Sequence, residues 1–156
     1  DEFVVGYGLD FAEYYRLAAY LFRYTNRRIG LAMGAMNLSE LFDEAYYSNL
    51  DGGILESFGR LFKNNLKLFV YPYLDPRTNE LVTIATLEVP PALRQLYGYL
   101  IDRRCIVQLT DINHAYLNIH SHEVLRKIRC DSTDWESMVP PKVAAAIKER
   151  KLFGYA

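Results

Sequence analysis

The residues with the clearest potential for chemistry are the three histidines, which all lie in one part of the chain. Zinc accepts imidazole, carboxylate and thiolate ligands. Residues two apart face the same side only in a strand, whereas the sequence after His120 reads as a helix start, which would splay His120 and His122. No Cys-x-x-Cys or His-Glu-x-x-His motif accompanies them. We therefore favour capping or surface roles and keep a metal site as the alternative; the ligand types available are His114, His120, His122, Asp111, Glu123, Cys105 and Cys130.

A second chemical candidate is the glycine pair Gly52-Gly53, which precedes an expected helix. Bare amides at a helix N-terminus can hold a phosphate or a carboxylate. Without an adjoining Lys or Ser/Thr motif, a sharp turn is the favoured interpretation. Dinucleotide, P-loop and Gly-x-Ser-x-Gly fingerprints are absent from the sequence. No catalytic residue is predicted from these motifs.

Residues 2–16 combine a short strand, a glycine-containing loop and a helix start. Phe3-Val4-Val5 has the composition of a buried strand. Asp10 and Glu13 have the spacing of a capping box, in which each side chain bonds the other residue's amide. The residues alone therefore predict an N-cap role for Asp10.

This stretch, Phe3-Val-Val-Gly-Tyr-Gly-Leu-Asp10 followed by an aromatic and acidic run to Arg16, resembles the C-terminal signature of the hypoxanthine-guanine phosphoribosyltransferases. The resemblance implies that Phe3 stacks on a purine and that the backbone of Val4 contacts the base edge. It implies that Asp10 lies beside the pyrophosphate and Mg²⁺. The expected function is therefore nucleotide metabolism with a purine-nucleotide-contacting segment. Whether the chain is an enzyme stays open; if it is one, the resemblance implies a purine phosphoribosyltransferase-like or nucleotide transferase fragment.

The resemblance covers residues 2–16 of 156 only. The paired acids, the Thr-Gly phosphate cradle and the purine-contacting Lys of that family do not precede the segment here. After Arg16 the helix continues, where the family has a Leu-Pro-containing strand. We expect the chain to be a fragment or fusion, incomplete as a phosphoribosyltransferase on its own, or to keep the local structure without the activity.

The central segment from Gly52 to Tyr73 resembles a bacterial domain associated with nicotinate- or nicotinamide-nucleotide adenylyltransferases. The Gly-His dipeptide and the Ser-Ser-Thr-x-x-Arg type motif of those enzymes are missing here. The resemblance therefore implies an accessory role.

Composition limits the partners. A net charge of -1 gives no global attraction to nucleic acid or to an anionic membrane, and the apolar runs are too short for a membrane span. Two cysteines do not form a disulfide framework, so reduced thiols and a cytoplasmic location are expected. The 13 tyrosines and 8 phenylalanines favour a protein partner or a homo-oligomer.

The elements that must position these residues centre on the helix-hairpin core at 52–89. Apolar residues have helical spacing at 54–62 and alternate with other residues, as in a strand, at 66–73. Turn residues at 75–80 precede a second expected strand at 81–89. The fold class predicted is α+β: a mostly helical single domain with a central β-hairpin. Its expected parts are a phosphoribosyltransferase-like segment at 1–16 and an α+β domain at 17–156, with a possible boundary between Arg16 and Ile29.

Two functions follow from the sequence. The first is a nucleotide-metabolism domain that contacts a purine nucleotide through Phe3, Val4 and Asp10, with Mg²⁺ as a possible cofactor. The second is a non-catalytic interaction or oligomerisation module that uses the Tyr-rich helices expected at 11–24 and 93–101.

Overall fold

The computed structural model describes residues 2–5, 14–130 and 132–155. By its internal contacts the chain divides into two compact units, which we call the N-terminal unit (residues 1–112) and the C-terminal unit (residues 113–156). This division differs from the boundary expected between Arg16 and Ile29. The reason is that the strand before Arg16 and the strand that begins at Ile29 hydrogen-bond in one sheet.

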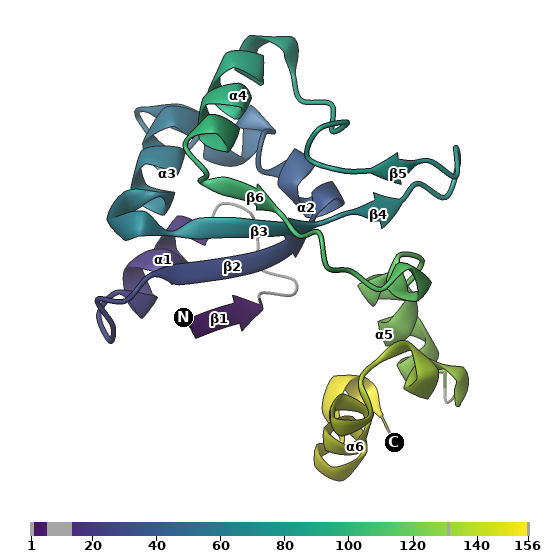
Figure 1. Ribbon diagram of the computed structural model, residues 1–156. Helices are drawn as coiled ribbons and strands as arrows, with labels where there is room; N and C mark the ends of the chain where they lie inside the picture. The colour runs from purple at the N-terminus through teal and green to yellow at the C-terminus, as the bar shows by residue number, and fades with distance from the viewer. Residues whose placement is uncertain (1, 6–13, 131, 156) are drawn as a thin grey trace. The chain divides into compact units, whose positions relative to one another are not determined.

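The N-terminal unit is built on a four-stranded parallel sheet with the strand order β1-β2-β3-β6 (Figure 1). Val4, Leu31, Leu68 and Ile106 pair in a single row across it. Of these, the last three are buried side chains at the centre of the core. The strands are β1 (Glu2–Val5), β2 (Ile29–Gly34), β3 (Lys67–Tyr71) and β6 (Ile106–Gln108).

The four strands lie side by side in the order in which they occur in the chain, so each connection moves one strand further across the sheet in the same direction. Right-handed crossovers of this kind place their helices on one face of a sheet. In agreement, α1 packs against α3, and α4 contacts β6. The helices are α1 (Tyr14–Leu21), α2 (Ala35–Glu40), α3 (Gly53–Leu61) and α4 (Arg94–Asp102), with short 3₁₀ turns η2 (Glu44–Tyr47), η3 (Lys63–Asn65) and η4 (Pro91–Leu93).

The fold is α+β, as predicted, but the central hairpin is smaller than expected. Its strands are β4 (Tyr73–Leu74) and β5 (Leu81–Val82), which pair antiparallel around a turn in which Asp75 accepts the Arg77 amide at 2.7 Å. The expected first strand is instead β3, bonded to parallel neighbours on both sides. Pro72 separates β3 from β4, because proline cannot donate to a strand ladder.

The expected second strand, 81–89, ends after Val82. The amide of Thr83 bonds the Thr86 hydroxyl at 2.9 Å, and the amide of Leu87 bonds the Thr83 carbonyl at the same distance. These local bonds form a turn, and threonine side chains compete with strand pairing in this way.

The C-terminal unit is helical in its described part, with α5 (Ser121–Arg129) and α6 (Pro141–Arg150) as its longer helices. Pro141 begins α6, where its missing amide hydrogen costs nothing. The 3₁₀ turns are η5 (His114–Tyr116), η6 (Asp134–Met138) and η7 (Leu152–Gly154). A separate small core fills this unit; its buried side chains are Val124, Ile128, Trp135, Ala144 and Ile147.

Throughout the described parts of both units, no helix is long and apolar enough to cross a lipid bilayer.

Candidate functional site

A cavity of about 400 Å³ lies against α1 and α3 in the N-terminal unit. Its lining is basic and aromatic, and we call it the α1–α3 groove. It falls within the usual volume range of small-molecule sites, roughly 300–1,000 Å³. The lining residues are Tyr15, Arg16, Ala19, Tyr20, Arg23, Arg60 and Lys63.

The helical period of α1 explains why its residues reach the groove. Arg16 and Tyr20 are four residues apart on α1, so they share one side of the helix, and Arg23 follows in the turn after Leu21. Tyr14 and Ala18 lie on another side and are buried in the core. The groove side of α1 is therefore the side that its core packing leaves exposed.

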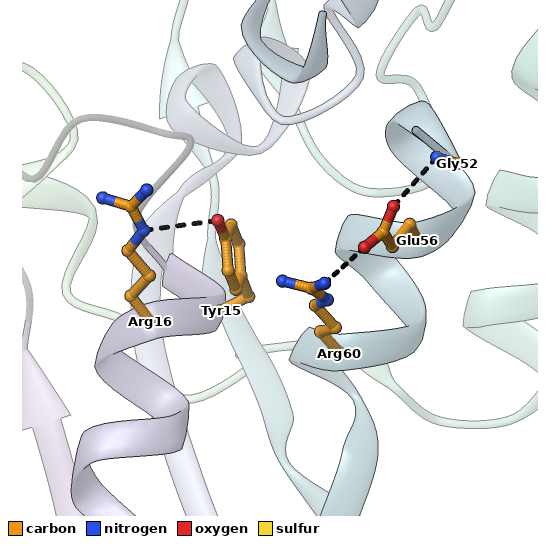
Figure 2. A network of polar contacts seen from close by, with 5 residues as sticks. All are labelled: Tyr15, Arg16, Gly52, Glu56 and Arg60. Atoms are coloured by element: carbon orange, nitrogen blue, oxygen red, sulfur yellow. Dashed lines mark hydrogen bonds and ion pairs between the residues drawn. The ribbon is translucent and has the colours of Figure 1, made fainter. Parts of the chain in front are cut away.

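Tyr15 is the anchor of the groove. Its ring is 9% exposed. The guanidinium carbon of Arg60 lies 5.5 Å from the ring centre, and that of Arg16 lies 5.8 Å from it. Arg16 Nε also donates a 3.3 Å hydrogen bond to the Tyr15 hydroxyl, as Figure 2 shows. One buried ring thus holds two cations at the groove.

Glu56 supplies the negative charge in this network. Its Oε1 pairs with Arg60 Nη2, one helical turn away, and its Oε2 accepts the Gly52 amide at 2.8 Å (Figure 2). The Gly52 amide is therefore already bonded. Gly53 has a φ of +54°, a conformation that suits glycine. The turn interpretation of the glycine pair is confirmed.

The groove carries an excess of positive charge. Four of its side chains are cationic, and all four residues are exposed. Arg60 is paired with Glu56. Among the residues that the structure describes, Arg23 and Lys63 form no ion pair. Arginine and lysine bind phosphate and carboxylate groups through charge-assisted hydrogen bonds. The arrangement is thus suited to holding an anion.

Tyr20 extends the aromatic part of the groove toward Tyr24. The two rings meet edge to face with centroids 5.1 Å apart, and the Tyr24 hydroxyl bonds that of Tyr20 at 3.3 Å. This hydrogen bond, with a smaller effect of burial, raises the pKa of Tyr24. The Tyr20 ring, 54% exposed, is a platform on which a planar group can stack.

The histidines differ from the expectation in one respect. The rings of His120 and His122 stack, with centroids 5.5 Å apart and planes at 22°, rather than splay. The reason is that His120, the N-cap of α5, has extended backbone angles, so only His122 is helical. In the described parts of the chain, no three His, Cys, Asp or Glu side chains lie where they could share a metal ion.

Two of the purine-contacting residues expected from the sequence, Phe3 and Val4, lie in β1. The backbones of Phe3 and Val4 pair with Gly30 and Leu31. The side chains of Phe3 and Val4, and the whole of Asp10, lie outside the part of the chain that the structure describes. Their roles toward a purine and Mg²⁺ stay predictions.

Comparison of the chain with protein-family models, with curated proteins and with solved structures finds no match. The groove itself was not predicted from the sequence. The spacing of Arg16, Tyr20 and Arg23 is the signal that could have indicated it.

Proposed function

We propose that the N-terminal unit binds a phosphorylated nucleotide, with its phosphates in the α1–α3 groove, and that the protein acts in nucleotide metabolism in the cytoplasm. The observation that carries this proposal is the set of four cations arranged around Tyr15 and Tyr20. A binding role is proposed here, rather than complete phosphoribosyl transfer.

The chemistry of the groove favours a phosphate over a carboxylate ligand. Arg23 and Lys63, which form no ion pair within the described residues, already exceed the charge of a single carboxylate, whereas a nucleotide carries two or more negative charges on adjoining oxygens. The planar guanidinium groups of Arg16 and Arg60 suit bidentate contact with phosphate. The exposed Tyr20 ring adds a stacking surface for a flat ring system, which is a sequence-tolerant way of holding a base.

The resemblance to the purine phosphoribosyltransferases supports the same ligand class independently. It assigns Phe3 and Val4 to the base and Asp10 to Mg²⁺. These three residues precede α1 in the chain. Their contribution is part of the proposal and is tested by the same titrations.

The test is isothermal titration with guanosine and inosine monophosphates and with inorganic tripolyphosphate, with and without Mg²⁺. The groove variant is Arg23→Ala/Lys63→Ala, because these cations have no ion pair within the described residues. The matched control is Arg77→Ala/Arg94→Ala, which removes the same charge from exposed positions outside the groove lining. Phe3→Ala and Asp10→Asn test the β1 segment.

Hydrogen bonds to charged groups contribute about 1.5–3 kcal/mol each, so we expect the groove variant to weaken tripolyphosphate binding by at least about tenfold. The control variant should change it little. Equal weakening by both variants would show that the effect comes from the net charge of the protein and not from the groove. An absence of binding to all three compounds would refute the proposal.

A second function is favoured by the Tyr20–Tyr24 pair. Tyr24 is 74% exposed although its ring is already ordered against Tyr20. Ordered exposed tyrosines are typical of protein interfaces. The alternative is therefore an interaction or oligomerisation module. A defined oligomer in size-exclusion chromatography that is lost in Tyr20→Ser/Tyr24→Ser would favour it, and a stable monomer would count against it.

A further inference from the structure

A second cavity, of about 580 Å³, lies at the end of α1. We call it the Asn26–Asn65 pocket. Its lining residues are Phe22, Asn26, Arg28 and Asn65. The lining thus contains two carboxamides, one aromatic ring and one guanidinium, and it differs in chemistry from the α1–α3 groove.

The pocket and the groove are formed by the same two chain segments. Phe22 lines the pocket, and its neighbour Arg23 lines the groove. On the second segment, Lys63 lines the groove and Asn65 lines the pocket. Phe22 and Arg23 are adjacent in the chain and Lys63 and Asn65 are two residues apart, so near neighbours in the sequence line the two cavities on both segments.

Local backbone structure fixes both asparagines. Asn65 ends η3 with a φ of +67°, a left-handed conformation that asparagine tolerates better than most residues. Asn26 lies inside a turn in which the Arg27 amide bonds the Thr25 hydroxyl at 3.1 Å. Neither carboxamide bonds another residue in the described part of the chain. Both donors and acceptors are thus available to a ligand.

Carboxamides pair well with the edges of nucleobases. An asparagine side chain offers one acceptor and two donors, which match the adjacent donor and acceptor atoms of a base. The half-buried ring of Phe22, which packs on the core, adds an apolar surface for a flat ring. Arg28 adds a cationic donor for a base carbonyl or a further phosphate oxygen.

We infer that the Asn26–Asn65 pocket holds the base of the nucleotide whose phosphates lie in the α1–α3 groove. This inference rests on the proposed function and deepens it. It places the base at the end of α1, with Asn26 and Asn65 as the residues that determine base preference. The resemblance of residues 2–16 to the phosphoribosyltransferase signature implies a base beside Phe3 instead. The two positions can be distinguished by experiment.

The probes are guanosine monophosphate, inosine monophosphate, ribose 5-phosphate and inorganic tripolyphosphate, each titrated calorimetrically. Ribose 5-phosphate lacks the base, and tripolyphosphate lacks both base and sugar. The pocket variant is Asn26→Ala/Asn65→Gly, in which glycine keeps the left-handed backbone of position 65. The matched control is Asn49→Ala/Asn79→Gly, because Asn79 is exposed and also has a positive φ, +56°.

We expect the wild type to bind the two nucleotides more tightly than ribose 5-phosphate. The pocket variant should lose roughly 5- to 150-fold in nucleotide affinity, the range expected for a bidentate base contact. Its affinity for tripolyphosphate and ribose 5-phosphate should be unchanged, and the control variant should match the wild type throughout.

Three outcomes would overturn the inference. Equal affinity of the wild type for nucleotide and ribose 5-phosphate would show that no base is recognised. Unchanged nucleotide affinity in the pocket variant, with a loss in Phe3→Ala, would place the base at β1. Both results leave phosphate binding in the groove intact. A failure of tripolyphosphate and of every nucleotide to bind would overturn the inference together with the proposed function.

Discussion

The guanidinium carbon of Arg60, on α3, lies 5.5 Å from the ring centre of Tyr15, on α1. Figure 2 shows the Tyr15 ring between Arg60 and Arg16. The two arginines come from distant parts of the sequence, and the ring is what brings their positive charges together. The two guanidinium groups are consequently held in place without a ligand, which would lower the ordering cost of the anion binding proposed above.

Tyr15→Leu should loosen this arrangement. Each cation–π contact contributes about 0.5–1 kcal/mol, so losing both should lower the free energy of unfolding by about 1–2 kcal/mol, and the buried volume that leucine does not fill adds to this loss. Tripolyphosphate should also bind more weakly, because Arg16 and Arg60 lose a fixed position. Urea unfolding and calorimetric titration measure the two effects.

Tyr15→Phe is the control for this change, since it keeps the ring and removes only the acceptor for Arg16 Nε. We expect it to retain most of the stability and most of the affinity. A Phe variant as defective as the Leu variant would mean that the hydroxyl, and not the ring, orients the groove.

Glu56→Gln should strengthen anion binding. The Glu56 carboxylate neutralises Arg60 and is the partner that a bound phosphate would have to compete with. Glutamine can still accept the Gly52 amide, so the start of α3 keeps its hydrogen bond. Because exposed i, i+4 ion pairs contribute only about 0.3–0.5 kcal/mol, stability should change little. Titration with tripolyphosphate at low and high salt measures the gain.

Glu88→Gln makes the same charge change at an exposed residue outside the groove lining. It should raise the affinity less than Glu56→Gln does. Equal gains in the two variants would show that only the net charge of the protein matters.

The fold could be predicted where local patterns decide the structure. The spacing of apolar residues changes from helical to alternating near Asn65, and this change correctly predicted a helix followed by a strand, which are α3 and β3. Pairing could not be predicted, because β3 bonds β2 and β6, and each partner is separated from it in the chain by at least one helix. The alternation of apolar residues is the same for a hairpin strand and for a strand of a parallel sheet with one face packed.

The groove could not be predicted for the same reason. Its cations lie on α1, on α3 and in the turns after them, and each set alone resembles an ordinary solvated helix surface. Only the packing of α1 on α3 brings Arg60 to Tyr15. The sequence indicates which face of each helix is apolar, but it does not indicate which other helix packs against that helix.

Phe42→Ala should destabilise the N-terminal unit strongly. Phe42 is fully buried and meets the rings of Phe58 and Tyr97 edge to face, with centroids 5.1 and 5.2 Å away. Truncating a buried phenylalanine costs about 3–5 kcal/mol. Phe42→Leu keeps most of the volume and should cost clearly less. Chemical denaturation followed by circular dichroism compares them, and similar losses in the two variants would contradict this account of the core.

Stability should fall at alkaline pH because of two buried tyrosines. Burial is the main cause that raises the pKa of Tyr47 and of Tyr97 to about 12, from an ordinary value of 10.0. Below pH 10 both phenols are neutral in the folded and the unfolded chain, so their stabilising effect is fully present. Between about pH 10 and pH 12 the unfolded chain releases these protons while the folded chain retains them, and the free energy of unfolding decreases.

A shift of two pKa units corresponds to about 2–3 kcal/mol for each tyrosine. The neutral hydroxyls also donate hydrogen bonds: Tyr47 to the Leu41 carbonyl at 2.8 Å and Tyr97 to the Ile84 carbonyl at 2.6 Å. Urea unfolding at intervals from pH 8 to pH 12 should show the decrease. Tyr47→Phe/Tyr97→Phe should start less stable but decline less steeply, because phenylalanine has no proton to lose. An equally steep decline in the double variant would assign the alkaline transition to other groups.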